Sequence, residues 1–373
     1  MSPETLRLLL QGLTSVTWQS AVMLLIGLLL VWLAIAKEYE PLLLLPIGAG
    51  AVLANLPLSP LVSEHGALTT LYNMGVENEL FPLLIFVGIG AMTDFGPLLE
   101  NPKMVLLGAA GQFGIFLTLI LALILGFTHN QAASIGIIGA IDGPTSIYVS
   151  NKLAPDLLAP ITVAAYSYMS LVPIIMPPIM RLLTTKKERS IRMPYSSREI
   201  SARTRILFPI VVTVVVGTLV PFATPLIGML MLGNLMRESK VVERLSGAAS
   251  NELANVVTLF LGLAIGSTMV GERFLRPATL AILVLGLVAF CLDTAAGVLF
   301  GKLMNVASGG KFNPLIGAAG ISAFPMAARV VQQEASKEDF DNFILMHAMG
   351  ANAAGQVASV VAGGVLLALM GAS

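Results

Sequence analysis

Residues 137–152 read IIGAIDGPTSIYVSNK, and this stretch indicates what kind of fold the chain adopts. An acidic residue, Asp142, stands next to the pair Gly143 and Pro144, after a run that is otherwise apolar. Glycine and proline both disfavour the interior of a helix. A carboxylate in hydrocarbon is costly unless a cation or hydrogen bonds compensate it. The stretch therefore predicts a helix that is interrupted inside a membrane, with Asp142 at the interruption.

The composition of the whole chain agrees with a membrane location. Of 373 residues, 56% are hydrophobic and 11% are charged, and the mean hydropathy is +0.87. Soluble domains carry about 25% charged residues, so we expect an all-α, polytopic membrane protein in the lipid bilayer. A formal net charge of zero gives no argument for a nucleic-acid partner, and the single cysteine, Cys291, excludes a disulfide within the chain.

Apolar segments fall into two sets of six. The first set covers residues 17–36, 41–56, 81–97, 103–127, 133–150 and 158–182, and the second covers 206–222, 224–236, 254–272, 278–303, 313–331 and 343–369. The first segment has no basic n-region and no small-residue cleavage site, so it is expected to be a retained transmembrane helix. A full span needs about 20 residues. Several segments are shorter, and the short ones contain glycine and proline.

The two sets are separated by a basic stretch, TTKKERSIRMPYSSREISARTR, at residues 184–205. It contains seven of the 21 lysine and arginine residues, and the positive-inside rule places such a stretch in the cytoplasm. We therefore expect a first membrane repeat at residues 1–182, a solvated cytoplasmic linker at 183–205 and a second membrane repeat at 206–373.

The two halves resemble copies of each other. PIGAGAVLANL at 46–56 aligns with PLIGMLMLGNL at 225–235, so that Asn55 and Asn234 are 179 positions apart. Pro102 and Pro277 are 175 apart, and the triplet IGA occurs at 138–140 and again at 316–318. Coincidence in a chain rich in glycine and alanine is the alternative. One cytoplasmic linker between two copies suits inverted repeats, in which paired broken helices form a substrate site near the midplane.

An inverted repeat needs an odd number of crossings, so one of the six segments in each half is expected to re-enter or stay partial. The two expected interrupted segments are 133–150 and 313–331. In the first, Asp142, the hydroxyls of Thr145 and Ser146, and carbonyl oxygens freed by the break would form a cage for Na⁺ or a hydronium ion. The alternative role for Asp142 is to cap the following half-helix, for which Pro144 is suitably placed.

In the second interrupted segment, Asn313-Pro314 and Pro325 enclose a glycine-rich run. Ser322 and Arg329 are seven residues apart, and would share one face if the segment were helical. A guanidinium fits a carboxylate through two parallel hydrogen bonds, so Arg329 is a candidate anion clamp. The alternative is that Arg329 extends its guanidinium to the membrane boundary to anchor the helix.

The helix after each interrupted segment also carries polar residues. Tyr166 and Tyr168 follow the first, while Asn352 and Gln356, four residues apart and hence on one face, follow the second. Close helix packing between small residues is the alternative use of that last stretch. Asp293 is either a second ion ligand or locally paired, and the sequence leaves both open.

Several kinds of site are absent from the sequence. Histidine and cysteine do not occur at metal-ligand spacing, no glycine-rich phosphate loop with a lysine is present, and no nucleophile with a histidine partner stands out. An ATP site is therefore not expected, and active transport would need another source of energy.

Five stretches together resemble the beta subunit of the sodium-pumping, biotin-dependent decarboxylases, which include enzymes for oxaloacetate, methylmalonyl-CoA, glutaconyl-CoA and malonate. They are GIGAMTDFGPLLENPK (88–103), GAIDGPTSIYVSNKLAP (139–155), AAYSYMSLVPIIMPPIM (164–180), GNLMRESKVVERL (233–245) and FILMHAMGANAAGQV (343–357). The motifs are long and specific, and the resemblance covers nearly the whole chain.

The resemblance implies that this chain decarboxylates carboxybiotin with uptake of a proton and moves Na⁺ outward across the inner membrane of a prokaryote. The implied partners are an alpha carboxyltransferase, a biotin carrier domain and a small gamma membrane subunit. Biotin would be attached to the carrier and not to this chain, and assembly of several copies is left open.

The resemblance also implies roles for individual residues. Asp142, Tyr168, Ser322 and Asn352 would hold Na⁺, and Tyr168 would carry the proton. Arg329, Asn313 and Gly317 would bind the carboxybiotin, with Arg329, Ser322 and Tyr168 serving the decarboxylation.

Two other functions fit the physical pattern of the sequence. Inverted repeats, broken helices and a buried carboxylate would equally suit a secondary Na⁺-coupled transporter for a small carboxylate. An inert anchor for soluble subunits is a third hypothesis, but an anchor gains nothing from the cost of burying Asp142 and Asp293.

Overall fold

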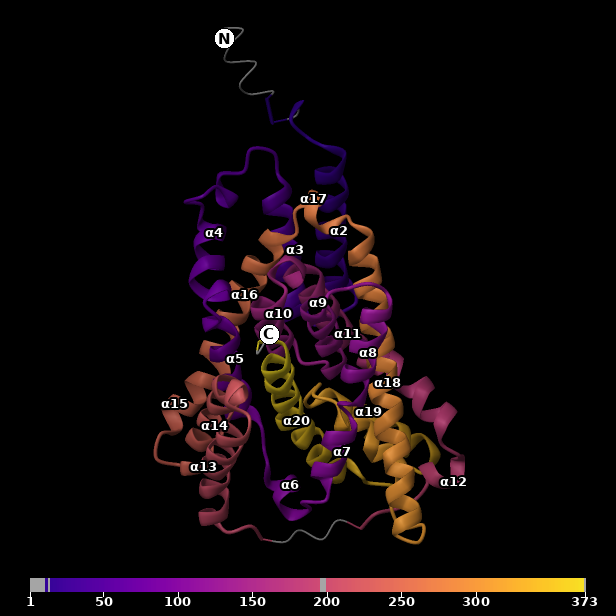
Figure 1. The fold of residues 1–373 in the computed structure, drawn as a ribbon. Helices are drawn as coiled ribbons and strands as arrows, with labels where there is room; N and C mark the ends of the chain where they lie inside the picture. Colours follow the sequence, from indigo (N-terminus) through magenta and orange to yellow (C-terminus); the bar gives the residue numbers. More distant parts are fainter. Residues whose placement is uncertain (1–10, 13, 195–198, 372–373) are drawn as a thin grey trace. The chain divides into compact units, whose positions relative to one another are not determined.

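The computed structural model describes residues 11–12, 14–194 and 199–371, and within these ranges every regular element is a helix (Figure 1). Seven helical stretches are long and apolar enough to cross a membrane. They are Trp18–Ala36, Met104–Ile124, Pro155–Leu183, Ala202–Leu219, Glu243–Thr268, Pro277–Ala307 and Leu345–Gly371. A bent pair, Pro41–Asn55 with Pro60–Glu77, turns by 103° and is either one more broken span or a re-entrant loop. The polytopic helical class is confirmed.

Two compact units divide the described chain, and the first comprises residues up to Pro82 together with Asn255–Ala281. Its elements are α2 (Trp18–Ala36), α3 (Pro41–Asn55), η1 (Pro60–Val62), α4 (Ala67–Leu71), η2 (Tyr72–Glu77), α16 (Ala254–Thr268) and α17 (Gly271–Phe274). Helices α3 and α16 approach closely, because a Cβ on Gly50 would lie 2.5 Å from the carbonyl oxygen of Leu263. Asn55 ties the end of α3 to the end of α16 by donating to the carbonyl of Met269 (2.7 Å).

The second unit comprises Leu83–Ala254 and Ile282–Ser373 and carries the residues expected to form the site. Its elements up to the linker are α5 (Leu80–Met92), α6 (Gly96–Glu100), α7 (Met104–Ala110), α8 (Phe113–Ile124), α9 (His129–Gly136), η3 (Ile137–Ala140), α10 (Gly143–Leu153), η4 (Pro155–Leu157), α11 (Leu158–Leu183) and α12 (Lys186–Arg189). Those after it are α13 (Ala202–Leu219), η5 (Pro221–Ala223), α14 (Thr224–Ser239), α15 (Glu243–Ala248), η6 (Ala249–Leu253), α18 (Pro277–Ala307), η7 (Pro314–Gly320), α19 (Met326–Glu338) and α20 (Leu345–Gly371).

The expected segments correspond to these helices but differ from them in several places, among them a helical stretch that begins at Glu243 and not at 254. The segment expected at 103–127 is divided into α7 and α8 by a turn at Gly111 and Gln112. Helical residues 67–77 lie where no apolar segment was expected, because their sequence ALTTLYNMGVE mixes polar with apolar residues.

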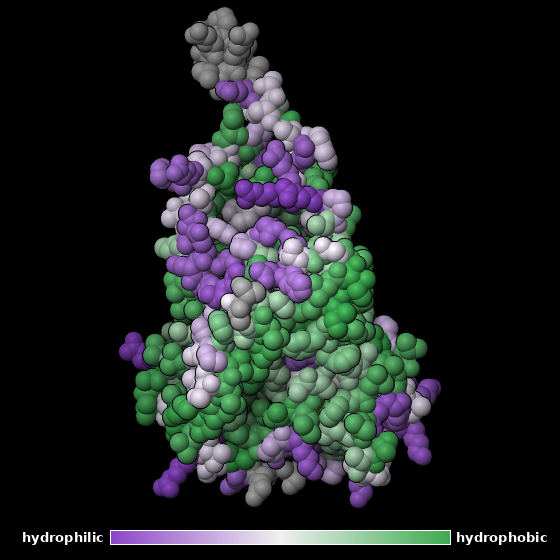
Figure 2. Space-filling model, viewed as in Figure 1, coloured by the Kyte–Doolittle hydropathy of each residue, from purple (hydrophilic) through white to green (hydrophobic). Residues whose placement is uncertain are grey.

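Surface chemistry fits a helical bundle in lipid. Figure 2 shows hydrophobic residues covering the part of the second unit where α8 and α18 lie in Figure 1. Hydrophilic residues gather near α12, which belongs to the basic linker. The bilayer accommodates a continuous apolar surface, and charged residues are expected at its boundaries.

Helix α20 is the centre of the second unit, where it packs against α7, α10 and α19 (Figure 1). Small residues make these contacts possible. A Cβ on Gly355 would lie 2.4 Å from the carbonyl oxygen of Gly320, and one on Gly363 would lie 2.8 Å from Cγ2 of Thr145. Both interrupted segments therefore lie against the same helix.

Candidate functional site

Both expected interruptions are present, and the first places Asp142 at the start of α10. Helix α9 ends at Gly136, a short 3₁₀ turn follows, and Ile141 takes a left-handed backbone conformation with φ of 51°. This conformation is unfavourable for a β-branched residue, and its cost is of the order of 1–3 kcal/mol. Ile141 is fully buried. The surrounding packing therefore holds a strained bend immediately before Asp142, as is typical of functional sites.

Asp142 is the N-cap of α10, because its Oδ1 accepts a hydrogen bond from the backbone N–H of Thr145 (3.3 Å). The capping role that the sequence offered as an alternative is thus present. It uses only one of the two carboxylate oxygens. The hydroxyl of Ser146, which was expected to face the ion, donates instead to the carbonyl of Asp142 one turn earlier in its own helix (2.8 Å).

The second carboxylate oxygen of Asp142 lies among hydroxyl groups from the other half of the chain. Its Oδ2 accepts from the hydroxyl of Ser322 (3.1 Å) and from that of Ser359 (2.7 Å), and these two hydroxyl oxygens are 3.0 Å apart. Ser322 follows η7, and its backbone N–H donates to the carbonyl of Ala140 (3.1 Å). The two interrupted segments therefore meet at Asp142 and Ser322.

Two side-chain amides of α20 complete the surroundings. Asn352 donates to the carbonyl of Ile321 (2.7 Å), and Gln356 donates to the carbonyl of Ser322. The expectation that they share one helical face is confirmed. Their amide oxygens, Oδ1 and Oε1, are buried and have no hydrogen-bond partner among the described residues. Since buried acceptors are normally satisfied, these two oxygens next to Ser322 are open to a cation or a hydrogen-bond donor.

The charge balance at Asp142 supports a cation as the partner of these oxygens. Within the described ranges no lysine, arginine or histidine pairs with its carboxylate, which is 4% exposed. Carboxylate, hydroxyl and amide oxygens are the ligands of hard cations such as Na⁺. The described residues contain no group of three or more His, Cys, Asp and Glu side chains that could hold a metal. The donor set therefore fits Na⁺ better than a transition metal.

The two tyrosines of α11 face different neighbours. The phenol of Tyr168 donates to the carbonyl of Leu283 in α18, and its ring lies against Gly286. The ring of Tyr166 lies against Gly143, where a Cβ would be 2.0 Å from the ring carbon Cζ. Tyr166 is therefore the tyrosine that contacts the residue after Asp142. The role expected for Tyr168 stays a prediction.

Asn313 and Gly317 have structural partners that the sequence did not indicate. The side chain of Asn313 caps η7 by accepting from the N–H of Leu315 (3.0 Å), and its amide donates to two carbonyls of the linker. A Cβ on Gly317 would lie 1.9 Å from the carbonyl oxygen of Gly297, so η7 crosses α18 at two glycines. Their expected contacts with carboxybiotin stay predictions.

Arg329 lies in the first turns of α19 with an exposed side chain. Ser322 lies before this helix begins at Met326, so the expectation that Ser322 and Arg329 share a helical face is wrong. Pro325 disfavours helix at the residue before it, which explains why the helix starts late. Within the described part of the chain no acidic side chain pairs with Arg329, whereas Arg181, Arg189 and Arg192 all have acidic partners. Its guanidinium is available to an anion.

Asp293 is a second buried carboxylate, and it lies outside this cluster. Its Oδ1 accepts from the N–H of Gly114 in the first turn of α8, which is a local pairing of the kind the sequence left open. Its Oδ2 is buried beside Gly139, and no described residue hydrogen-bonds it.

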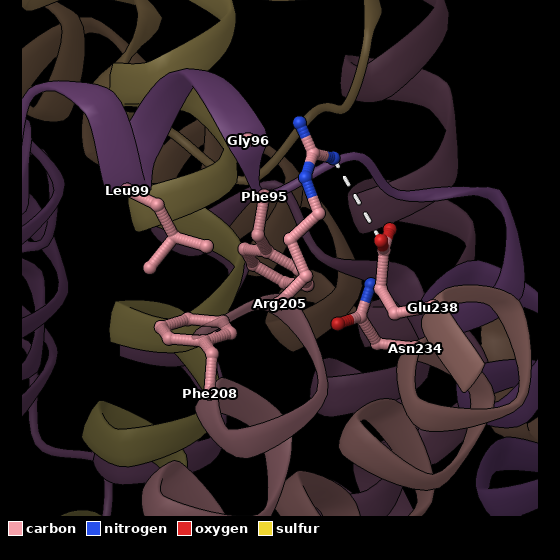
Figure 3. Close-up of a pocket in the computed structure, with 7 residues that line it drawn as sticks. All are labelled: Phe95, Gly96, Leu99, Arg205, Phe208, Asn234 and Glu238. Carbon is pink, nitrogen blue, oxygen red and sulfur yellow. Dashed lines mark ion pairs between the residues drawn. The ribbon is translucent and has the colours of Figure 1, made fainter. Parts of the chain in front are cut away.

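A small pocket of the second unit lies elsewhere (Figure 3). Phe95, Leu99 and Phe208 form its apolar wall, and Arg205 pairs across it with Glu238 (3.7 Å). None of the residues expected to form the site lines this pocket.

The polytopic fold, the broken helices and an oxygen-rich cluster around a buried carboxylate define a polytopic helical membrane protein with a candidate site for a small cation. The sequence comparisons then assign the chain to one family. Residues 19–370 match the family described as the Na⁺-transporting oxaloacetate decarboxylase beta subunit, and the chain belongs to it.

Named relatives cover nearly all of this chain. It is 55% identical to the methylmalonyl-CoA decarboxylase subunit beta of Veillonella parvula, over 96% of this chain and 95% of the relative. It is 53% identical to the glutaconyl-CoA decarboxylase subunit beta of Acidaminococcus fermentans, over 96% of each. It is 50% identical to the oxaloacetate decarboxylase beta chain of Klebsiella pneumoniae, over 98% of each. The chain is thus a beta subunit of a Na⁺-transporting decarboxylase and a multi-pass protein of the bacterial inner membrane.

Proposed function

We propose that this chain decarboxylates carboxybiotin, which a partner's carrier domain presents, and uses the free energy released to move Na⁺ outward. The relatives support this assignment, because their names give three different acids while their sequences stay 50–55% identical to this chain. A subunit that is so similar across three substrates is expected to perform the step that all three pathways share. Selection of the acid would then belong to a carboxyltransferase, with a small gamma subunit as a further membrane partner.

The chemistry of this step requires an anion site and a proton. Carboxybiotin carries a carboxylate on a ureido nitrogen. When CO₂ leaves, the N–C bond breaks, its electron pair stays on the nitrogen, and the nitrogen takes up one proton. A positioned acid speeds such a step. We propose that Arg329 binds the carboxylate, that Ser322 and Asn313 with Gly317 line the same site, and that Tyr168 carries the proton.

The cluster around Asp142 is the single observation that carries the proposal of Na⁺ coupling. A carboxylate surrounded by neutral hydroxyl groups in a membrane gains from binding a cation. Asp142, Ser322, Asn352 and Tyr168 are proposed as Na⁺ ligands. Ser359, which the sequence did not suggest, is added to them because its hydroxyl contacts the same carboxylate oxygen as Ser322.

Decarboxylation of free carboxybiotin by the reconstituted complex in proteoliposomes tests this proposal, with CO₂ release and ²²Na⁺ movement measured together. Asp142→Asn removes the charge but keeps the shape, so Na⁺ affinity should fall about 10- to 100-fold, the value of a charge-assisted contact. Ser359→Ala removes one neutral hydroxyl ligand and should lower Na⁺ affinity about 2- to 10-fold. Asp156→Asn, at an exposed residue of η4, is the matched control and should behave as wild type.

Two results would reject the assignment. Normal Na⁺ dependence in Asp142→Asn would remove Asp142 from the ion site. Na⁺-coupled uptake of a carboxylate without any CO₂ release from carboxybiotin would favour a secondary transporter instead.

A further inference from the structure

The linker between the two halves is packed against the protein over residues 184–193, although its composition predicted a solvated segment. Thr184 and Arg189 are buried, and α12 begins with a capping box between Thr185 and Glu188. The guanidinium of Arg189 donates to Glu338 of α19 (2.6 Å) and to the carbonyl of Thr184 (2.6 Å). This part of the linker is thus bound to the helix that carries Arg329.

Two asparagines bind the same two carbonyl groups of this linker. The amide of Asn313 donates to the carbonyls of Arg189 (3.0 Å) and Ile191 (2.9 Å). The amide of Asn342 donates to the same carbonyls, at 3.2 Å in each case. Both asparagines are fully buried. Each amide group has two N–H donors and each carbonyl oxygen can accept two bonds, so the four hydrogen bonds saturate both sides. We call these two amides and two carbonyls the asparagine clamp.

The clamp closes the segment that contains the expected substrate residues. Asn313 stands at the N-terminus of η7, and Asn342 stands between α19 and α20. Ser322 and Arg329 lie between them. Both ends of the segment that carries Arg329 are therefore held on one short piece of backbone.

We propose that Asn342 is a positioning residue for carboxylate binding by Arg329, through the asparagine clamp. Among the described residues its amide oxygen has no hydrogen-bond partner, so the side chain of Asn342 forms its hydrogen bonds through the amide N–H groups. The backbone carbonyl of Asn342 is held separately by Gln332 of α19 (2.9 Å), which orients the asparagine toward the linker. The expected change in KM for carboxybiotin rests on the proposed function, whereas the expected change in trypsin cleavage of the linker does not.

Asn342→Ala tests the proposal in the reconstituted complex, with Asn251→Ala as the control. Asn251 is exposed and donates within its own helical turn to Gly247, so its loss should change nothing. Loss of two neutral hydrogen bonds by Asn342→Ala should raise KM for free carboxybiotin about 5- to 50-fold. The kcat and the half-saturating Na⁺ concentration should stay within about twofold, because Asp142 keeps its contacts. Trypsin should also cleave after Arg189 faster than in wild type, since Asn342 no longer holds the backbone carbonyl of Arg189.

The outcomes separate the two proposals. The proposal is rejected if Asn342→Ala keeps both the wild-type KM for carboxybiotin and the wild-type rate of trypsin cleavage. It is also rejected if Na⁺ affinity falls by the same factor as KM rises, because a general structural defect would change both. If wild type itself does not decarboxylate carboxybiotin, the proposed function fails, and the trypsin measurement still decides whether the clamp holds the linker. If Asn342→Ala does not accumulate in membranes, Asn342→Gln replaces it, because a longer amide stays polar but cannot reach both carbonyls in the same register.

Discussion

At the scale of single residues, Asp142 shows how one side chain serves the fold and the site together. One carboxylate oxygen caps α10 through Thr145, and the other accepts from Ser322 and Ser359. The sequence offered capping and ion binding as alternatives, and the geometry makes them compatible. The cap fixes the direction of the carboxylate at the start of α10, so the second oxygen faces the serines of the other half of the chain.

Arg329→Lys tests whether this residue clamps the substrate or only anchors α19. Lysine keeps the charge but loses the planar pair of donors that matches a carboxylate. If Arg329 binds carboxybiotin, kcat/KM should fall about 10- to 100-fold, as expected for loss of a charge-assisted hydrogen bond. The half-saturating Na⁺ concentration should change little, because a guanidinium repels Na⁺. Steady-state decarboxylation at matched protein levels measures both, and near-normal kcat/KM would leave only the anchoring role.

The residues of the site were predictable from sequence where spacing or chemistry marked them. Asp142 stood out as a charge, and Asn352 with Gln356 stood out by helical spacing. Ser359 was missed, although it is seven residues after Asn352 and three after Gln356, and therefore lies on the same face. A serine in a helix rich in glycine and alanine also suits plain packing, so its type alone carries little information.

At the scale of elements, the two main interruptions were predictable because proline and glycine mark them. The break between α7 and α8 was not, since Gly111 and Gln112 follow an apolar run without proline. There Gln112 donates to the carbonyls of Gly108 (3.1 Å) and Gly320 (3.3 Å), so a partner 208 residues away supports the turn. Packing of the linker on α19 was also unpredictable, because its ion pairs join residues 147 and 149 positions apart with no periodic pattern.

The pH dependence of stability should reveal the attachment of the linker to α19. Arg192 hydrogen-bonds Asp339 (2.6 Å) and lowers the pKa of that carboxyl below its ordinary value. A lowered folded-state pKa stabilises the protein above the unfolded-state pKa of about 3.9, and that stabilisation is lost as the pH falls through the folded-state value. The difference in Tm between wild type and Asp339→Asn should therefore be constant from about pH 7 to 5 and shrink below about pH 4.

Thermal unfolding in detergent across this pH range measures the effect. In an Arg192→Gln background the pH-dependent step at Asp339 should become smaller, because the largest cause of the lowered pKa is gone and only the hydrogen bond from the N–H of Asp341 remains. A difference that vanishes already above pH 5, or that persists unchanged in the Arg192→Gln background, would contradict the assignment.

At the scale of the whole molecule, we propose that residues 1–182 and 206–373 are inverted repeats joined by the linker. Residues 1–10 and 195–198 lie outside the described residues. Two equivalent hydrogen bonds support the proposal. Asn55 at the end of α3 donates to Met269 just after α16, and Asn234 of α14 donates to Thr93 just after α5 (3.0 Å). Each bond joins one half to the other, as exchange about a two-fold axis requires. The compact units mix segments of both halves and do not follow the repeats.

Cysteine labelling from each side of the membrane tests this topology in a variant with Cys291 replaced by serine. Single cysteines at the exposed positions Lys187, Asn130 and Lys311 report on the linker, on the start of α9 and on the loop that precedes η7. An impermeant maleimide should label Lys187→Cys and Lys311→Cys only from the cytoplasm and Asn130→Cys only from outside. Labelling of Asn130→Cys and Lys311→Cys from the same side would exclude inversion, and an external linker would reverse the orientation.

The hydrogen bond between Asp142 and Ser359 also has a consequence for biosynthesis. The two residues are 217 positions apart in the chain. At 5–20 residues per second, translation takes roughly 10 to 40 s to pass from one to the other. Until Ser322 is made, 180 residues after Asp142, the nascent chain contains Asp142 without either of its serine partners, and insertion of an aspartate at the centre of a span costs about 2.5–3.5 kcal/mol. The first half is therefore synthesised before the groups that hydrogen-bond its buried carboxylate, and the second of these partners is present only after the ribosome has made α20.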